Sequence, residues 1–311
     1  MQTTHPAPNS QALCIHNFHA MGSPCCLQFY AARPDQAQRV ATEVQQRIQQ
    51  LEQRYSRYLP NSIISLVNSR AGTGCNTAPD PETFALLRYA EQCYTESEGL
   101  FDVTSGVLRQ IWHFNQLDTI LPTQETINAL LPLIGWEKVQ WSAERLYLPV
   151  AGMELDFGGI VKEYAADLAA NVCLSLGITS GVVELGGDLR IIGAMPDGRG
   201  WPVAIRDPRQ PERTVAQLEL TTGALASSGD YERFQIINGV RYSHLLNPKT
   251  GWPVSGLRAV SVIADQCVIA GSLATIAMLK AHTGLGWLKS CGLPFLACRN
   301  NGKIINHLFS T

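Results

Sequence analysis

The sequence predicts an α+β fold in which helices pack against mixed or antiparallel sheets. Helix-like patterns are concentrated in the first half of the chain, whereas strand-like runs dominate residues 181–264. Short glycine-containing turns join several of these runs, and such turns connect antiparallel neighbours. The chain has 311 residues, of which 45% are hydrophobic, so it can bury a large core. We expect one domain over residues 18–311, preceded by a polar tail over residues 1–17.

The first expected helix lies within residues 33–59. Its apolar side chains recur with the spacing of one helix face, at Val40, Val44, Ile48, Leu51 and Tyr55.

Capping residues predict the next helices. Asp80 followed by Pro81 is typical of an N-cap and a first helical position, and this helix should run to about residue 97 and stop at Gly99. A shorter helix should begin after residue 123 and end near residue 135. Another follows residue 159 and ends at Gly177, where a C-terminal glycine is expected. The last helix should occupy residues 268–281.

The strands are expected from alternating or continuous apolar runs. Residues 25–31, "CCLQFYA", alternate as a strand does, and further runs cover 181–194, 201–207, 214–220, 234–246 and 258–264. Gly186-Gly187 and Asn238-Gly239 interrupt two of these runs, and the second pair strongly favours a hairpin. Residues 294–309 should form a final hairpin that turns at Asn301-Gly302.

Charge and composition exclude several classes of protein. The formal net charge is -2, and Lys and Arg are scattered, so we expect no nucleic-acid partner. No run approaches the roughly 20 apolar residues that a membrane-spanning helix needs. The first residues have neither a basic nor an apolar segment typical of a signal peptide. Nine cysteines without a C-x-x-C motif fit a reducing compartment, and we expect a cytoplasmic protein.

Three common enzyme signatures are missing from the sequence. It contains neither the G-x-x-x-x-G-K-[ST] motif of P-loop proteins nor the G-x-S-x-G motif of α/β-hydrolases. The stretch "GTGCNT" does not match the dinucleotide-binding G-x-G-x-x-G motif. A P-loop protein, a Rossmann dehydrogenase and an α/β-hydrolase are therefore not expected.

Residues 155–167, "LDFGGIVKEYAAD", combine an acid, two glycines and a lysine where a strand turns into a helix. Glycines permit positive φ angles and close backbone approach. A helix N-terminus attracts a phosphate, and Lys162 could add its charge to the same anion. The alternative is a tight turn with a solvated lysine, and this stretch alone does not decide between the two.

Five stretches, taken in order, resemble the ApbE family of FAD:protein FMN transferases. They are "AMGSP" (20–24), "RYSRYLPNSIISLVN" (54–68), "GLFDVTSGVL" (99–108), "LDFGGIVKEYAAD" (155–167), and the set "VELGGDLR", "SSGDYER" and "RYSHLLNPKTG" (183–251). The resemblance runs from about residue 18 to residue 290. It implies an enzyme that cuts FAD at its diphosphate and attaches FMN to a Thr or Ser of a target flavoprotein. AMP is released, and Mg²⁺ is normally required.

The resemblance also implies the site residues. The expected FAD contacts are Met21, Tyr58, Leu100, Phe101, Asp102, Asp156, Lys162 and Leu246. The carbonyl of Gly159 and the side chain of Thr275 are expected metal ligands. Such a site neutralises diphosphate charge and holds the acceptor oxygen in line with the phosphorus. Structural alternatives remain open for Met21 as core filling, Tyr58 as a loop aromatic and Phe101 as a helix anchor.

His244 is the expected catalytic base. An imidazole titrates near neutrality and could take the proton from an incoming Thr hydroxyl. A histidine at a strand end is otherwise more often structural, and the surrounding "RYSHLLNPKTG" favours the catalytic interpretation. Residues 228–231 fit a binding loop. Glu184 and Asp188 flank a Gly-Gly turn, and no individual role is assigned to them.

The chain departs from the family pattern at the expected metal site. Where the family has A-D-A-x-x-T, residues 270–275 read "AGSLAT", so Gly271 replaces the acid that supplies a ligand. Mg²⁺ favours carboxylate oxygen, and glycine has no side chain. Ala274 replaces a second acid that some members carry, and Asn247 replaces the usual Asp. Glu163 stands where a glycine is common, and we expect it to be exposed in a first helical turn.

These departures leave three accounts of the metal site. Mg²⁺ could be held through FAD phosphates, Gly159, Thr275 and water, or another ligand such as Glu163 or Ser272 could replace the acid. In the third account the chain retains the flavin site and has lost transfer. A flavin transferase is the first hypothesis. The alternatives are a flavin-binding carrier or regulator, and an FAD pyrophosphatase in which water replaces the acceptor hydroxyl.

Overall fold

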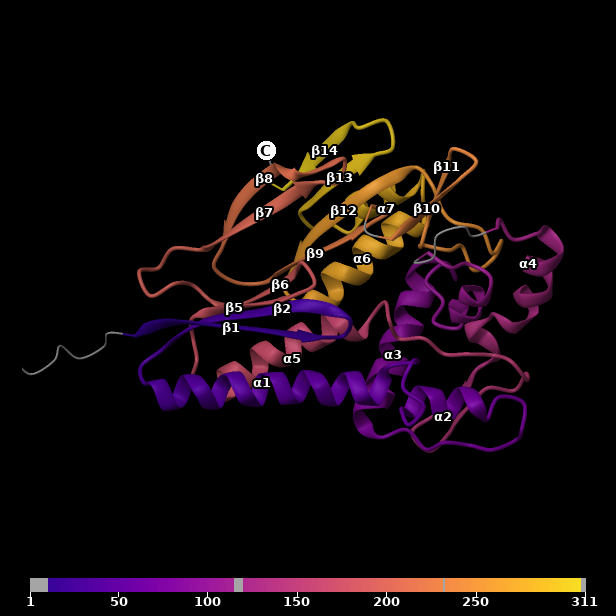
Figure 1. Cartoon of the computed structure of the whole chain (residues 1–311), viewed down its shortest axis with the longest axis horizontal. Helices are drawn as coiled ribbons and strands as arrows, with labels where there is room; N and C mark the ends of the chain where they lie inside the picture. Colours follow the sequence, from indigo (N-terminus) through magenta and orange to yellow (C-terminus); the bar gives the residue numbers. More distant parts are fainter. Residues whose placement is uncertain (1–10, 115–119, 232, 309–311) are drawn as a thin grey trace, which may run out of the picture.

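A computed structural model describes residues 11–114, 120–231 and 233–308 of the chain (Figure 1). Its centre is an eight-stranded sheet in which every neighbouring pair is antiparallel. In spatial order the strands are β1 (Ala12–Ala20), β2 (Ser23–Ala31), β5 (Gly181–Leu185), β6 (Asp188–Gly193), β9 (Ala224–Gly229), β12 (Leu257–Ala264), β13 (Phe295–Arg299) and β14 (Ile304–His307). The predicted α+β class with antiparallel sheets is confirmed.

Helices cover one face of this sheet. The α-helices are α1 (Pro34–Tyr55), α2 (Ile63–Ser69), α3 (Pro81–Glu96), α4 (Gln124–Leu130), α5 (Val161–Ser175), α6 (Cys267–Leu279) and α7 (Gly284–Ser290). Helix α5 packs on β5 and β6, α6 packs on β9 and β12, and α1 packs on α5 (Figure 1). The main core fills the space between these helices and the sheet.

The opposite face of the sheet is covered by a hairpin. Strands β7 (Trp201–Asp207) and β8 (Gln210–Leu220) pair with each other and not with the large sheet. Val203 and Ile205 of β7 pack against Leu225 and Leu296 of that sheet. This second cluster shields the face that the helices leave uncovered (Figure 1).

Shorter elements complete the fold. They are the hairpins β3 (Gln140–Trp141) with β4 (Leu146–Tyr147) and β10 (Phe234–Ile237) with β11 (Val240–Ser243), and the 3₁₀ turns η1 (Ser105–Gln110), η2 (Leu131–Leu133) and η3 (Trp136–Lys138). Asn238 and Gly239 both have positive φ angles, 52° and 79°, as the predicted hairpin turn requires.

Local sequence signals account for most helix ends. The carboxylate of Asp80 accepts hydrogen bonds from the amides of Glu82 and Thr83, so it caps α3 as predicted. Gly177 has a φ of +82° directly after α5. Two helices were not predicted, α2 and α7. Each has seven residues, too few to show a helical period, and α7 contains two glycines.

The predicted polar tail is too long at its C-terminal end. Strand β1 begins at Ala12 and pairs in register with β2, from Ala12 opposite Ala31 to Ala20 opposite Ser23. Residues 12–17 are therefore part of the sheet, and exposed and half-buried side chains alternate along them: Leu13 and Ile15 are exposed, whereas Cys14 and His16 are half-buried. Residues 1–10 lie outside the described part of the chain. In the described ranges, no helix is both long and apolar enough to cross a membrane.

Candidate active site

Two of the sequence motifs lie side by side at the beginning of α5. The amide of Asp156 donates to the carbonyl oxygen of Val103, with an N–O distance of 2.8 Å. A Cβ atom built on Gly159 would lie 3.2 Å from Cζ of Phe101. Residues 101–103 are therefore packed against the turn that leads into α5, and the structure brings together Phe101, Asp156 and Gly159.

The two glycines of this turn are needed for space rather than for backbone conformation. Neither Gly158 nor Gly159 has a positive φ, contrary to one of the two reasons that the sequence offered. A Cβ on Gly158 would lie 2.9 Å from Oδ1 of Asp156, whose carboxylate accepts from the Gly158 amide. Close approach, the other expected reason, is confirmed by these contacts.

Asp156 is the centre of a charged network. Its Oδ2 lies 3.2 Å from Nη1 of Arg57 and 3.3 Å from Nη1 of Arg109. Arg109 also donates to the hydroxyl of Tyr58 at 3.1 Å, and Arg57 lies beside the Tyr58 ring. The Tyr58 side chain is otherwise well exposed, at 74%. Arg57, Arg109 and the exposed ring of Tyr58 thus form one cluster with Asp156.

Asp102 has a structural environment. One carboxylate oxygen accepts from the amide and the hydroxyl of Thr104, at 2.7 and 2.6 Å, and the other accepts from the amide of Trp136 at 3.1 Å. The residue is buried. These bonds fix the turn after Phe101, so Asp102 shapes the segment. Direct contact of Asp102 with FAD stays a prediction.

Lys162 is not the solvated lysine of the alternative interpretation. It lies half-buried between two acids, with its ammonium in contact with Oδ2 of Asp188 and 3.4 Å from Oε1 of Glu163. Burial acts to lower the pKa of Lys162, but the charges of Glu163 and Asp188 outweigh burial and raise the pKa above its usual range. Burial in turn raises the pKa of Asp188, and Lys162 opposes that rise. The ammonium of Lys162 and the carboxyl group of Glu163 lie in the first turn of α5, and the carboxyl group of Asp188 reaches them from β6.

The N-terminus of α5 also lacks a capping side chain. Ser62, Asp80 and Thr123 cap α2, α3 and α4, whereas the N-cap position of α5 is Ile160. Uncapped amides at a helix N-terminus favour an anion. This feature fits the phosphate that the motif predicts.

Glu163 is buried, which corrects the expectation that it would be exposed. Its relative exposure is 9%, and Oε2 has no hydrogen-bond partner among the described residues. Helix α6 covers it, and a Cβ built on Gly271 would lie 2.5 Å from Cγ of Glu163. Thr275 lies one helical turn beyond Gly271, on the same face of α6. A buried oxygen without a partner beside these residues is suited to a cation such as Mg²⁺.

The pairing of α5 with α6 is fixed by Asp167. Its two carboxylate oxygens accept from the amides of Cys267 and Val268, at 2.8 and 2.9 Å, and so cap α6 from the neighbouring helix. Arg190 of β6 lies 3.0 Å from the same carboxylate. Since Glu163 is one turn before Asp167 and Gly271 is one turn after Cys267, this cap sets Glu163 against Gly271.

His244 follows β11 and is half-buried. Its Nδ1 lies 3.0 Å from the carbonyl oxygen of Arg233, which can only accept, so Nδ1 carries the proton and Nε2 has a free lone pair. Burial lowers the pKa of His244 to about 4, and the charges of Arg233 and Arg109 act in the same direction. A neutral imidazole with a free Nε2 is able to accept a proton.

The remaining predicted contacts lie in two different clusters of the core. Leu246 packs in a cluster with Trp112, whose ring also contacts Phe114, and the edge of Phe114 faces His244. Met21 is half-buried in the β1–β2 turn and has a positive φ of 53°. Leu100 is half-buried beside Phe101. Both carboxylate oxygens of Asp102, like those of Asp156, are engaged by partners within the protein.

Sequence reasoning missed two charged residues of the site, Arg57 and Arg109, and assigned no role to a third, Asp188. Arg57, Arg109 and Asp188 bind the side chains of predicted residues. Arg57 lies inside a quoted motif, and Arg109 follows directly after another. Only the fold shows that two such distant segments share the carboxylate of Asp156.

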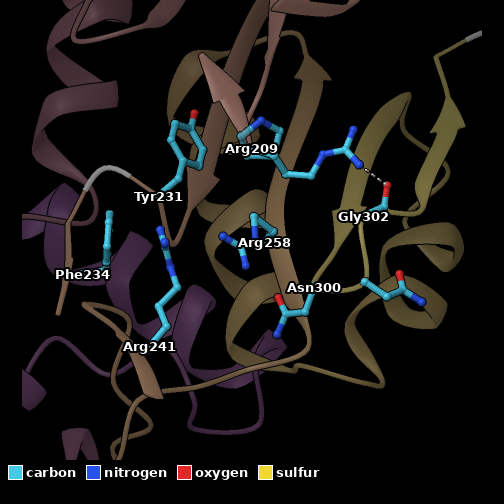
Figure 2. A pocket seen from close by; sticks show the side chains of 9 residues that line it. Arg209, Tyr231, Phe234, Arg241, Arg258, Asn300 and Gly302 are labelled. Atoms are coloured by element: carbon cyan, nitrogen blue, oxygen red, sulfur yellow. Dashed lines mark hydrogen bonds between the residues drawn. The ribbon is translucent and has the colours of Figure 1, made fainter. Parts of the chain in front are cut away.

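A separate basic cavity lies outside these residues. Its volume is about 510 Å³, and its lining includes residues of β10, β11 and β12 and of the turns that follow β7 and β13. Figure 2 shows these side chains, with Arg209 donating to the carbonyl of Gly302. Arg241 and Arg258 lie 3.7 and 3.9 Å from the single carboxylate of Asp230. None of the predicted FAD contacts lines this cavity. The FAD cleft therefore stays a prediction.

Comparison with known proteins covers nearly the whole chain. The ApbE family model matches residues 21–296. The FAD:protein FMN transferase of Vibrio cholerae is 30% identical over 260 residues, which are 82% of this chain and 78% of that protein. The FAD:protein FMN transferase of Chlamydia trachomatis is 31% identical over 255 residues, 79% of this chain and 77% of that protein.

Solved structures agree with the sequence comparison. The ApbE protein of Thermotoga maritima superposes with a TM-score of 0.85 at 28% identity, over 95% of this chain and 97% of that one. The flavin transferase ApbE of Vibrio cholerae gives the same TM-score at 27% identity and the same coverage. The match includes every motif that contributes to the site, and the chain belongs to the ApbE family.

Proposed function

We propose that this protein is an FAD:protein FMN transferase. The hydroxyl oxygen of an acceptor Thr or Ser attacks the phosphorus on the FMN side of the FAD diphosphate. A phosphoester to FMN forms, the bond to the bridging oxygen breaks, and AMP leaves with that oxygen. Relatives of this name that match most of the chain support the proposal.

The main observation in support of the proposal is the protonation state and tautomer of His244. Its neutral imidazole, with Nδ1 bonded to the Arg233 carbonyl, presents Nε2 as the acceptor for the proton of the attacking hydroxyl. Removing this proton makes the hydroxyl oxygen a better nucleophile.

We assign FAD binding to Tyr58 and to the charged network around Asp156, in the turn before α5. The exposed ring of Tyr58 offers a surface for the isoalloxazine, with Met21 and Leu246 as apolar neighbours. Arg57 and Arg109, oriented by Asp156, supply positive charge for the diphosphate. Phe101 packs against the turn at Gly159, and Leu100 packs against the main core beside it.

Lys162, Glu163 and Asp188 together carry an excess of one negative charge when ionised, so this group suits a cation better than a bare phosphate. We assign to it Mg²⁺, which neutralises diphosphate charge when bound, with the Gly159 carbonyl and Thr275 as further oxygen donors. All nine cysteines are unpaired, which supports a reducing compartment such as the cytoplasm. The flavoprotein that carries the target Thr or Ser is the protein partner.

The test combines FAD, Mg²⁺ and a candidate acceptor flavoprotein with one target threonine. Release of AMP only with the acceptor, with FMN bound to it, is the expected result. An acceptor whose threonine is replaced by alanine should release none. Free FMN and AMP without any acceptor would identify a pyrophosphatase instead. Tight FAD binding with no cleavage would identify a flavin-binding protein.

A further inference from the structure

We infer that Glu163 supplies the carboxylate of the Mg²⁺ site in this chain, in place of an aspartate at position 271. The inference rests on the proposed function, because the metal is that of the FAD diphosphate. It places the carboxylate ligand on α5, whereas relatives with the A-D-A-x-x-T pattern carry it at the position of Gly271, on α6.

The first step is geometric. The Cβ of a residue at 271 would lie 2.5 Å from Cγ, 3.1 Å from Cδ and 3.2 Å from Oε1 of Glu163. The Glu163 side chain therefore occupies the volume into which an aspartate at 271 would project. With the Glu163 side chain in this position, any larger residue at 271 would clash with it, and glycine avoids the clash.

The second step concerns the unused oxygen. Oε1 of Glu163 faces the ammonium of Lys162 at 3.4 Å, whereas Oε2 is buried without a partner among the described residues. An unpartnered buried carboxylate oxygen is unfavourable unless a cation or a donor completes it. The orphan atom is thus an available ligand atom and not a solvated surface charge.

The third step excludes the nearest competitor. Ser272 also has a buried hydroxyl, which has no hydrogen-bond partner in the described part of the chain. Its side chain lies beside Tyr89 and Cys93 of α3 and perturbs the pKa of both groups. Gly271, by contrast, faces Glu163, and the Asp167 cap holds α5 and α6 in this register. The carboxylate of Glu163 is the better candidate for the missing ligand.

The experiment measures metal binding directly. Each variant, saturated with FAD and without acceptor, is titrated with Mn²⁺ in place of Mg²⁺, and free Mn²⁺ is followed by electron paramagnetic resonance. Glu163→Gln should weaken Mn²⁺ binding by more than about 10-fold. Ser272→Ala and the exposed acid control Glu144→Gln should bind Mn²⁺ as the unmodified protein does.

A carboxylate exchange makes the test specific. Glu163→Gly should lose Mn²⁺ binding, and Gly271→Asp alone should not improve it because the two acids collide. The double variant Glu163→Gly with Gly271→Asp should bind Mn²⁺ within about threefold of the affinity of the unmodified protein. In binding free energy, this threefold difference is less than half of a 10-fold loss. Unfolding temperatures without metal confirm that each variant is folded, and flavin fluorescence confirms bound FAD.

The outcomes separate the two proposals. Mn²⁺ binding by Glu163→Gln equal to that of the unmodified protein would overturn this inference alone. So would a folded, FAD-bound double variant that binds no Mn²⁺. If the unmodified protein does not bind FAD at all, the proposed function fails and the inference falls with it.

Discussion

The Nδ1 atom of His244 is held 3.0 Å from the carbonyl oxygen of Arg233, which fixes the tautomer that a general base requires. The ring lies at the edge of the aromatic cluster and close enough to Arg109 for that charge to act on it. This arrangement joins the end of β11 to the charged network around Asp156.

Replacing His244 should affect the chemical step far more than binding. His244→Ala is expected to lower kcat for FMN transfer by about 10²- to 10⁴-fold, because the attacking hydroxyl loses its proton acceptor. FAD affinity should change little. Added imidazole should restore part of the rate, which a purely structural loss would not allow. Single-turnover AMP release measures this, and equal rates for variant and unmodified protein would exclude the role.

The rate of FMN transfer should not fall near pH 6.5, where an ordinary histidine becomes protonated. With a pKa of about 4, His244 is about 97% neutral at pH 5.5, whereas a histidine with an ordinary pKa would be about 9% neutral. The folded pKa is below the unfolded one, so acid favours unfolding and the base is lost only as pH falls toward 4. We expect kcat/KM to stay level from pH 7 to pH 5.5. A half-maximal value near pH 6.5 would contradict this.

Two glycine-to-alanine changes in helices should have opposite effects on stability. Gly271→Ala places a methyl group 2.5 Å from Cγ of Glu163 and should lower the free energy of unfolding by about 1–3 kcal/mol. Gly286→Ala in α7 meets no atom within 4 Å and should be stabilising by up to about 1 kcal/mol. Urea unfolding compares them, and in a Glu163→Ala background the cost at 271 should largely disappear.

Asp167 should matter for stability through α6. Asp167→Ala removes two hydrogen bonds to the first amides of α6 and leaves Arg190 without its carboxylate, so we expect a loss of about 2–4 kcal/mol. Asp197→Ala, which breaks an exposed pair with Arg199, should leave thermal unfolding unchanged. Equal effects of the two substitutions would show that the cap contributes little.

Tyr58 should contribute to flavin binding without contributing to folding. Its side chain is mostly exposed, so Tyr58→Ala should leave the unfolding temperature unchanged. Loss of the ring should weaken FAD binding by about 2- to 10-fold, the range for one aromatic contact. Tyr58→Phe retains the ring and should bind FAD almost normally. Flavin fluorescence titration distinguishes these outcomes, and unchanged affinity in Tyr58→Ala would remove this residue from the site.

The sequence contained enough information for the main local elements. Helix α1 was predicted because its buried residues recur at one face over several turns, and α3 because Asp80 and Pro81 mark its first residues. The β10–β11 turn followed from Asn238-Gly239. The order of strands was not predictable, because β6 and β9 pair across about thirty intervening residues whose path depends on the whole core.

The site was predictable where motifs supplied positions and unpredictable where packing decides contacts. Large residues recur with helical spacing along α5 at Tyr164, Leu168 and Val172, but these are only half-buried. The deeply buried positions instead include small or acidic residues such as Ala166 and Glu163. An apolar period cannot identify such a face, because alanine contributes little to the pattern and an acid contradicts it.

The contact between Glu163 and Gly271 has a consequence for how relatives should be compared. The carboxylate belongs to a location in space that either helix can reach, so a signature written along one helix would misjudge chains of this kind as defective. Across relatives, the residues at these two positions should vary as a pair: glycine at the first with aspartate at the second, or glutamate with glycine. Chains with an acid at both positions, or at neither, should be rare.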